Sequence, residues 1–234
     1  MIGLGNRIVS SQNPVTSSVV ATTPGLQVWY QFNTGLTESG SNVTRWEDRS
    51  GNGNDLTQTT ATNQPLKTSP AGGIHLDGTD NFMTLDTAVN LTTFTIFAAI
   101  QLDGTSLETL FGNGTDGTDF FRLNGSAWTL RTDGSSFQQN LGTSTGTDKY
   151  LVTLYSEVGA SSTRYYLENN STAESNILID NKTFTIGDVG RNSANAQFFD
   201  GKVYEIVIYN EELSQETRES VERDIDARNQ IGIF

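Results

Sequence analysis

The sequence predicts an all-β protein, a two-sheet antiparallel jelly-roll sandwich with one short helix near the C-terminus. Short segments rich in Val, Ile, Phe and Tyr alternate with clusters of Gly, Asn, Asp and Ser, which is the pattern of strands joined by tight turns. One of these segments, residues 94–102, is apolar on both faces. Residues 198–228 change from a β-rich pattern to a helical one. Together these observations indicate a sandwich that closes on a helix.

The first 24 residues are predicted to form an extended arm, followed by a single jelly-roll domain at residues 25–234. Residues 9–23 of this arm consist largely of Ser, Thr and Val, and the arm contains Pro14 and Pro24, which push the residues before them away from helical geometry. All-β sandwiches commonly run to about 200–250 residues as one domain. The sequence shows no internal repeat that would divide it further.

The strands of the first half follow from β-propensity. Residues 26–32 (LQVWYQF) and 43–46 are rich in β-branched and aromatic side chains, which suit a pleated and partly buried surface. Between this pair and the next, residues 48–54 are mostly Asp, Ser, Gly and Asn, which form loops because Gly and Asn accept positive φ. Two further strands are predicted at residues 73–77 and 82–86.

Residues 94–102 (FTIFAAIQL) show the clearest alternation in the chain. One face of this segment would carry Phe94, Ile96, Ala98, Ile100 and Leu102. The opposite face is also apolar, because it carries Phe97 and Ala99. A strand that is apolar on both faces is expected at the centre of a sheet that is covered on both sides.

Further strands are expected wherever apolar and β-branched residues lie between turn formers. They cover residues 108–112, 119–124, 127–132, 150–157, 163–168, 183–187 and 202–209. The helix follows the last of these. Ser214 is placed to cap it, and Arg223 and Arg228 lie toward its C-terminal end, as the helix dipole favours. The apolar stripe of this helix consists of Leu213, Val221 and Ile225.

Charge and composition exclude several classes of protein. Fourteen Lys and Arg against 27 Asp and Glu give a formal charge of −13, which repels nucleic-acid phosphates and anionic lipid surfaces. No segment offers the ~18 apolar residues of a membrane span, and no signal-peptide core is present. Because the chain has no Cys, it forms neither disulfides nor thiolate metal sites, and a reducing, non-secretory origin is expected.

Three groups of motifs occur in a recognisable order. The first is the run from Trp46 to Leu56 followed by Gln64-Pro65, and the second is Ile74-His75-Leu76-Asp77-Gly78 followed by Asp80-Asn81-Phe82. The third consists of Phe199, Gly201, Glu205, Tyr209-Asn210 and Leu213-Ser214. This series resembles the laminin-G-like jelly rolls of the concanavalin A-like lectin and glucanase superfamily, as found in phage and bacterial surface proteins. The resemblance spans nearly the whole chain and implies the fold, but this fold carries lectins, glycosidases and structural modules alike.

A calcium site is one interpretation of the loop at residues 112–119 (GNGTDGTD). The resemblance implies Ca²⁺ at a rim of the sandwich, held by Asp, Asn and carbonyl oxygens. Asn113, Asp116 and Asp119 would supply several of the six to eight oxygen ligands that Ca²⁺ takes. The other interpretation is an ordinary hairpin turn, since Gly, Asn and Asp are also the usual turn residues.

No catalytic residues are predicted. Retaining glucanases of the superfamily carry two carboxylates on one strand as Glu-x-Asp-x-x-Glu, and this motif is absent. Glu222-Arg223-Asp224 imitates half of it but is expected on a solvated helix face. Glu205 is expected to accept hydrogen bonds from a loop or from Arg or Tyr. His75 is expected to be an ordinary strand residue.

Three functions follow as hypotheses. The first is a non-catalytic structural component of a phage virion, a decoration or tail-associated protein, located in the virion and docked through residues 1–24 on identical copies or other virion proteins. The second is a glycan-binding, lectin-like adhesin whose partners are surface glycans. The third, a glycoside hydrolase, is the one that the missing carboxylate motif disfavours most.

Overall fold

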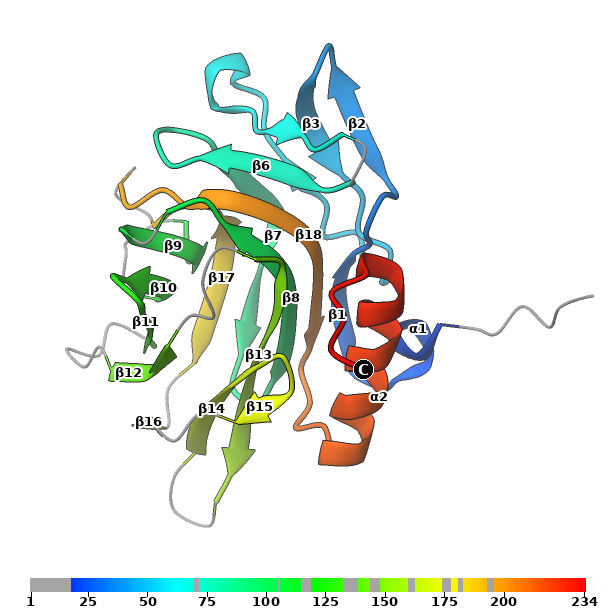
Figure 1. The fold of residues 1–234 in the computed structure, drawn as a ribbon, viewed down its shortest axis with the longest axis vertical. Coiled ribbons are helices and arrows are strands. Elements are labelled where there is room, and N and C mark those ends of the chain that lie inside the picture. The colour runs from blue at the N-terminus through cyan, green and yellow to red at the C-terminus, as the bar shows by residue number, and fades with distance from the viewer. Residues whose placement is uncertain are drawn as a thin grey trace, which may run out of the picture.

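Two layers of antiparallel strands and a C-terminal helix make up the computed structural model, as the sequence predicts (Figure 1). The structure describes residues 18–69, 72–104, 106–114, 119–132, 139–143, 148–159, 163–173, 178–180, 183–192 and 196–234. In this part of the chain, no helix is both long and apolar enough to cross a membrane.

The first layer is built around β18 (Asp200–Tyr209). One edge of β18 pairs with β8 (Thr95–Leu102), and its other edge pairs with β6 (Ile74–Asp77) and then with β1 (Leu26–Tyr30). The sheet continues from β8 through further strands. These are β13 (Tyr150–Val158), β14 (Thr163–Asn169), β15 (Thr172–Ala173) and β16 (Leu178–Asp180).

The second layer runs from β4 to β12 and is hydrogen-bonded to the first through a short connection of strands. Its members are β4 (Leu56–Thr57), β7 (Met83–Leu91), β17 (Phe184–Val189), β9 (Leu107–Gly112), β10 (Phe120–Asn124), β11 (Ala127–Arg131) and β12 (Gln139–Thr143). The connection consists of β2 (Leu36–Ser39), β3 (Asn42–Trp46), the 3₁₀ turn η1 (Ala61–Asn63) and β5 (Leu66–Lys67). Here β3 pairs with β4, and β5 pairs with β6.

Two hydrophobic cores lie on opposite faces of the first layer. Ile96, Ala98 and Ile100 of β8 enter the main core between the two layers, whereas Phe97 and Ala99 enter a second core on the outer face. The structure therefore confirms that this strand is covered on both sides. Strand β18 contributes to both cores in the same way.

The helix α2 (Gln215–Asn229) covers the outer face of the first layer (Figure 1). The Ser214 hydroxyl accepts the N–H of Thr217 at 3.3 Å, which confirms the predicted cap. The predicted stripe of Leu213, Val221 and Ile225 is buried in the second core.

A buried ion pair fixes α2 on the sheet. The Glu205 side chain is fully buried, and its Oε1 accepts Nη2 of Arg228 at 2.7 Å and Nε1 of Trp29 at 2.9 Å. Its Oε2 accepts Nδ2 of Asn229 at 2.6 Å. The expected role of Glu205 as a structural acceptor is thus confirmed, with an Arg among its donors.

The prediction of a solvated face for Glu222-Arg223-Asp224 is wrong for Glu222. This residue lies within α2, as expected, but it is fully buried and accepts the Thr153 hydroxyl at 2.7 Å. Burial raises the pKa of the Glu222 carboxyl above its ordinary value, and the Ser171 and Thr153 hydrogen bonds oppose that shift. The apolar stripe alone does not predict this burial, because α2 also contacts β13 through the Glu222 side chain.

The last residues of the predicted arm pack on the domain itself. Residues 18–23 form one helical turn, α1 (Val19–Thr22), instead of an extended strand. Val20 is fully buried in the second core, and the Ser18 hydroxyl donates to Oδ2 of Asp224 at 2.6 Å. The Tyr209 hydroxyl donates to the Val20 carbonyl at 3.0 Å. Residues 1–17 lie outside the described residues, so docking of the arm on other molecules stays a prediction.

Candidate functional site: an acidic pocket

Four carboxylates meet at the edge of the sandwich where β6, β8, β9 and β18 come together. Asp77 ends β6, and Asp200, which begins β18, is its direct cross-strand partner. Asp103 follows the end of β8, and Glu108 is the second residue of β9. Asp77, Glu108 and Asp200 line an open pocket of about 380 Å³, and Asp103 lies next to Asp200 beside it. Its lining includes Asp77, Ser106, Glu108, Gln197, Phe198 and Asp200.

Strand register and close backbone packing bring these residues together. The backbone N–H of Asp103 donates to the carbonyl of Asp200 at 3.0 Å, which ties the end of β8 to the start of β18. Next to it, a Cβ on Gly201 would lie 2.3 Å from the carbonyl oxygen of Gln101, so only glycine fits there. The carboxylate of Asp77 is held by its own turn, where Oδ1 accepts the N–H of Thr79 at 2.9 Å.

Glu108 is the unusual member of this group, because it is a buried acid that has no basic partner among the residues that the structure describes. Glu108 is only 2% exposed. Oε1 accepts the backbone N–H of Ser106 at 2.9 Å, whereas Oε2 is buried without a hydrogen-bond partner among the described residues. Burial raises the pKa of the Glu108 carboxyl above its ordinary value, and the charges of Asp200 and Asp103 add to this rise against the backbone hydrogen bonds.

Glu108 and Asp200 form a close pair. A side-chain Cβ on Gly104 would lie 2.9 Å from Oε1 of Glu108 and 3.0 Å from Oδ2 of Asp200, so these two oxygens are at most 5.9 Å apart. The two carboxyl groups differ in environment, since Asp200 is partly exposed and Glu108 is buried. Burial and the nearby charges both favour the protonated form of Glu108 over its ionised form.

The replacement Glu108→Gln is expected to stabilise the protein at pH 7. Because the pKa of folded Glu108 is raised above 4.5, its protonated form contributes stability that is fully present below the ordinary pKa and is lost as the pH rises through the folded pKa. Gln imitates the protonated form at every pH. The melting temperature of the variant should therefore exceed that of the wild type at pH 7, and the difference should shrink toward pH 4.

Thermal unfolding between pH 4 and pH 8 measures this difference. Asp86→Asn, at an exposed carboxylate on β7 that does not line the pocket, is the matched control. A difference between Glu108→Gln and the wild type that stays constant over this range would contradict the assignment.

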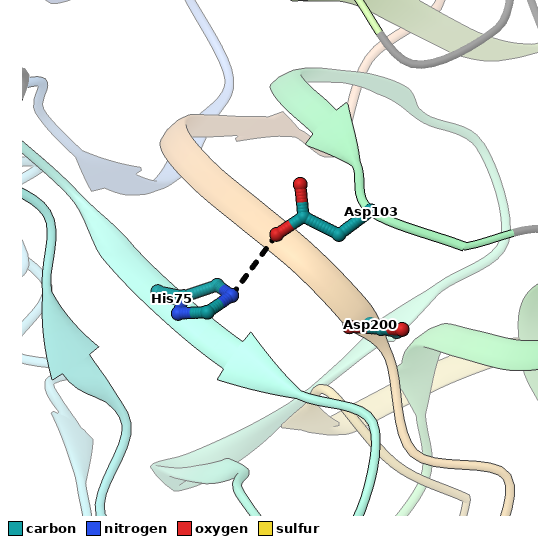
Figure 2. A group of neighbouring side chains, drawn as sticks. All are labelled: His75, Asp103 and Asp200. Atoms are coloured by element: carbon teal, nitrogen blue, oxygen red, sulfur yellow. Dashed lines mark hydrogen bonds and ion pairs between the residues drawn. The ribbon is translucent and has the colours of Figure 1, made fainter.

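A possible cation position lies beside the pocket at His75, Asp103 and Asp200 (Figure 2). One ligand atom from each lies within 4.8 Å of the others, and Nε2 of His75 is 3.0 Å from Oδ2 of Asp103. However, Nζ of Lys202 already contacts both oxygens of Asp103, at 2.8 and 3.0 Å. Since an ammonium group neutralises Asp103 in place of a metal, we assign no metal to this cluster.

The predicted calcium ligands lie elsewhere, around the turn between β9 and β10. Asn113 and Asp119 flank this turn and are both buried, and Oδ2 of Asp119 accepts the backbone N–H of Thr185 at 2.7 Å. Asp116 lies outside the described residues. The structure therefore brings Asn113 and Asp119 to the same hairpin, and Ca²⁺ binding there stays a prediction.

Sequence reasoning missed the acidic pocket. His75 was expected to be an ordinary strand residue, yet it lies beside Asp103 at the rim. The available signal was the pair of Asp-Gly steps at Asp77-Gly78 and Asp200-Gly201, each at one end of a predicted strand. Nothing in their spacing indicates that the two ends are adjacent.

No family model matches the sequence, and no curated protein matches it. Solved structures do match. *Trypanosoma rangeli* sialidase in complex with sialic acid has a TM-score of 0.57 and 17% identity, over 89% of this chain and 34% of the sialidase chain. An arabinofuranosidase complexed with arabinofuranosyl-alpha-1,2-xylobiose has a TM-score of 0.56 and 16% identity, over 80% of this chain and 51% of that one. The chain thus spans about a third and about half of these proteins, and it shares a jelly-roll-like β-sandwich with them.

These matches correct the first functional hypothesis. A non-catalytic phage structural protein is the wrong expectation, because the matching folds are those of glycosidases. The expectation that the chain is not an enzyme is wrong on the same ground. That expectation depends on the absence of the Glu-x-Asp-x-x-Glu motif within one strand, whereas the fold brings Glu108 and Asp200 together from two different strands. At this level of identity the likeness establishes the fold, and the activity has to be argued from the pocket.

Proposed function

We propose that this chain cleaves a glycan in the acidic pocket, as a glycoside hydrolase domain of the concanavalin A-like, laminin-G-like kind. The observation that carries the proposal is the pair of Glu108 and Asp200, which open onto one pocket and have unequal environments. The similarity in fold to a sialidase and an arabinofuranosidase supports it. The chemistry that such a pair performs is general acid catalysis beside a nucleophilic carboxylate.

We propose a retaining reaction, because the bound on the separation of the two facing oxygens lies below the inverting range. Retaining glycosidases place them about 5–5.5 Å apart and inverting ones about 6.5–9.5 Å apart, whereas the two facing oxygens here are at most 5.9 Å apart. In this reaction Glu108 gives its proton to the glycosidic oxygen while the bond from that oxygen to the anomeric carbon breaks. Asp200 attacks the same carbon and forms an ester. Water then cleaves the ester and returns its proton to Glu108.

The remaining lining suits a sugar. Gln197 and Ser106 bring polar groups to the pocket, and Phe198 adds an aromatic ring. Side-chain amides and hydroxyls can both donate and accept, as sugar hydroxyls do. The volume of about 380 Å³ lies in the range of about 300–1,000 Å³ that small-ligand pockets occupy.

Hydrolysis by the wild type and three variants tests the proposal. The wild type should release reducing sugar from a member of a polysaccharide and aryl-glycoside panel. We expect Glu108→Gln and Asp200→Asn each to lower kcat by about 100-fold or more, because each removes one proton-transfer or nucleophilic group. Asp86→Asn, which does not line the pocket, should leave kcat unchanged.

The leaving group distinguishes the two roles. An aryl glycoside with an acidic phenol needs little protonation, so it should restore much of the activity of Glu108→Gln but not that of Asp200→Asn. The assignment would be refuted if Asp86→Asn lost as much activity as the two pocket variants. It would also be refuted if the wild type cleaved nothing in the panel.

Glycan binding without cleavage is the second candidate, and one observation favours it. Oε2 of Glu108 is buried away from solvent, so a substrate reaches the acid only through Oε1 or after a local opening. If the pocket binds without cleaving, isothermal titration should give the same affinity for the wild type and Glu108→Gln, with no product after long incubation. That outcome would leave the pocket as a lectin-like site.

A further inference from the structure

Lysines are scarce in this chain, yet three of the four gather at one place. The sequence has a formal charge of −13 and contains four lysines and a single histidine. Lys67, Lys202 and His75 line a second open pocket of about 290 Å³, together with Tyr204. Nζ of Lys149 lies 4.0 Å from the centre of the Tyr204 ring. Three of the four lysines and the only histidine therefore surround this one tyrosine.

The basic pocket adjoins the acidic one on the same pair of strands. On β18, Asp200 and Lys202 are two residues apart and share a face, and on β6 their cross-strand partners are Asp77 and His75. The acidic partners line the first pocket, and the basic partners line the second. Because a strand rises about 3.4 Å per residue, Asp200 and Lys202 are about 7 Å apart along β18. A chain of sugars that lies along β6 and β18 would therefore pass from one pocket into the other.

The two lysines are available to a ligand. Nζ of Lys67 contacts Oε1 of Glu38 at 2.7 Å, and the two side chains are 35% and 31% exposed. Nζ of Lys202 contacts Asp103 at 2.8 Å with 27% of the lysine side chain exposed. Exposed pairs of this kind hold their partners weakly, so a ligand anion can take the place of a protein carboxylate or share the ammonium group with it.

The apolar part of the pocket fits the body of a sugar ring. Leu66 is 43% exposed beside the lysines, so it presents an apolar surface to the pocket. An apolar surface beside two ammonium groups matches a ligand with one hydrophobic face and one negative group. The acidic pocket has the opposite character and would repel such a group.

We infer that the basic pocket is a subsite for a negatively charged sugar residue, one that bears a carboxylate or a sulfate, adjacent to the sugar held in the acidic pocket. The inference rests on the proposed function and assigns its substrate class. The ammonium groups of Lys67 and Lys202 bind the anion, and Leu66 packs against the ring. The preferred glycan is therefore acidic at one position and neutral at the next.

Paired probes that differ only in charge test this subsite. Tetragalacturonate is compared with its methyl ester, sialyllactose with its methyl ester, and a sulfated oligosaccharide with its desulfated form, by isothermal titration. The wild type should bind the charged member of at least one pair about tenfold or more tightly, the effect of one hydrogen bond to a charged group. This preference should weaken with rising salt concentration.

Lysine variants locate the preference. Lys67→Gln and Lys202→Gln should each reduce affinity for the charged probe about tenfold and leave the neutral probe unaffected. Arg45→Gln, at an exposed basic residue paired with Asp55 away from both pocket linings, should bind as the wild type does. Circular dichroism melts of all variants confirm that each is folded.

The outcomes separate the subsite from the proposed function. Equal affinity for charged and neutral probes, or lysine variants that bind as the wild type does, would overturn the subsite even if a neutral glycan were bound and cleaved. Binding of neither kind of probe would overturn both. Glu108→Gln should lose cleavage but keep the preference for the charged probe. Cleavage that persists in this variant would overturn the catalytic pair without affecting the subsite.

Discussion

Replacing Glu205 by Ala is expected to lower the free energy of unfolding by about 3 kcal/mol, the lower end of the cost of breaking a buried ion pair. Arg228 is only 17% exposed at its side chain and would lose its fully buried acceptor, although its Nη1 would keep the Asp224 carboxylate at 2.8 Å. Nε1 of Trp29 and Nδ2 of Asn229 would also lose the oxygen atoms that they donate to. The ion pair joins α2 to β18, so the loss should loosen the helix on the sheet.

Urea unfolding measures this change, and Arg45→Ala is the matched control. Arg45 also pairs with an acid, Asp55, but its side chain is 46% exposed. Removal of an exposed pair should cost less than about 1 kcal/mol. If Glu205→Ala and Arg45→Ala cost the same, burial does not govern the strength of the Glu205 pair and our account of the α2 anchor is wrong.

The second large effect is expected at Val20, in the short segment that precedes β1. Val20→Ala should lower the free energy of unfolding by about 2 kcal/mol, because the side chain is fully buried between α2 and the sheet. Val19→Ala is an adjacent control of the same chemistry. Since Val19 is 36% exposed, its replacement should change stability by no more than about 0.5 kcal/mol.

Two truncated chains extend the test. A chain that begins at Gly25 loses Val20 together with the hydrogen bonds of Ser18 to Asp224 and of Tyr209 to the Val20 carbonyl. It should be destabilised at least as much as Val20→Ala, whereas a chain that begins at Ser18 keeps these contacts. Equal stability of the two truncated chains would show that α1 is dispensable for the fold.

Much of the fold could be predicted from the sequence, because strand signals are local. The apolar faces of β8, the cap at Ser214 and the stripe of α2 all depend on spacings within one segment, and the structure confirms them. The sequence predicts no strand between residues 32 and 43, but Leu36–Ser39 forms β2, which pairs with β3. Its Thr and Ser residues take strand geometry because a neighbouring strand offers hydrogen bonds, and short-range patterns do not contain that information.

The candidate site could not be predicted, because it is made entirely by tertiary structure. Glu108 and Asp200 are far apart in the sequence and meet only because β9 and β18 begin at the same edge of the sandwich. A search for a carboxylate pair within one strand cannot find them. The gathering of lysines around Tyr204 is similarly invisible, because Lys67, Lys149 and Lys202 belong to different segments.

The central position of β18 has a consequence for how the protein folds. This strand is translated after all the other strands, yet it lies between β1 and β8, and its Tyr209 is the cross-strand partner of Leu26. Neither core can therefore close around the first layer until β18 has left the ribosome. Contacts between such distant segments slow folding, because the chain loses loop entropy before it gains the pairing. Until β18 has been synthesised, the apolar faces of β8 stay uncovered and one of its edges stays unpaired. Aggregation and chaperone binding are therefore most to be expected during this part of synthesis.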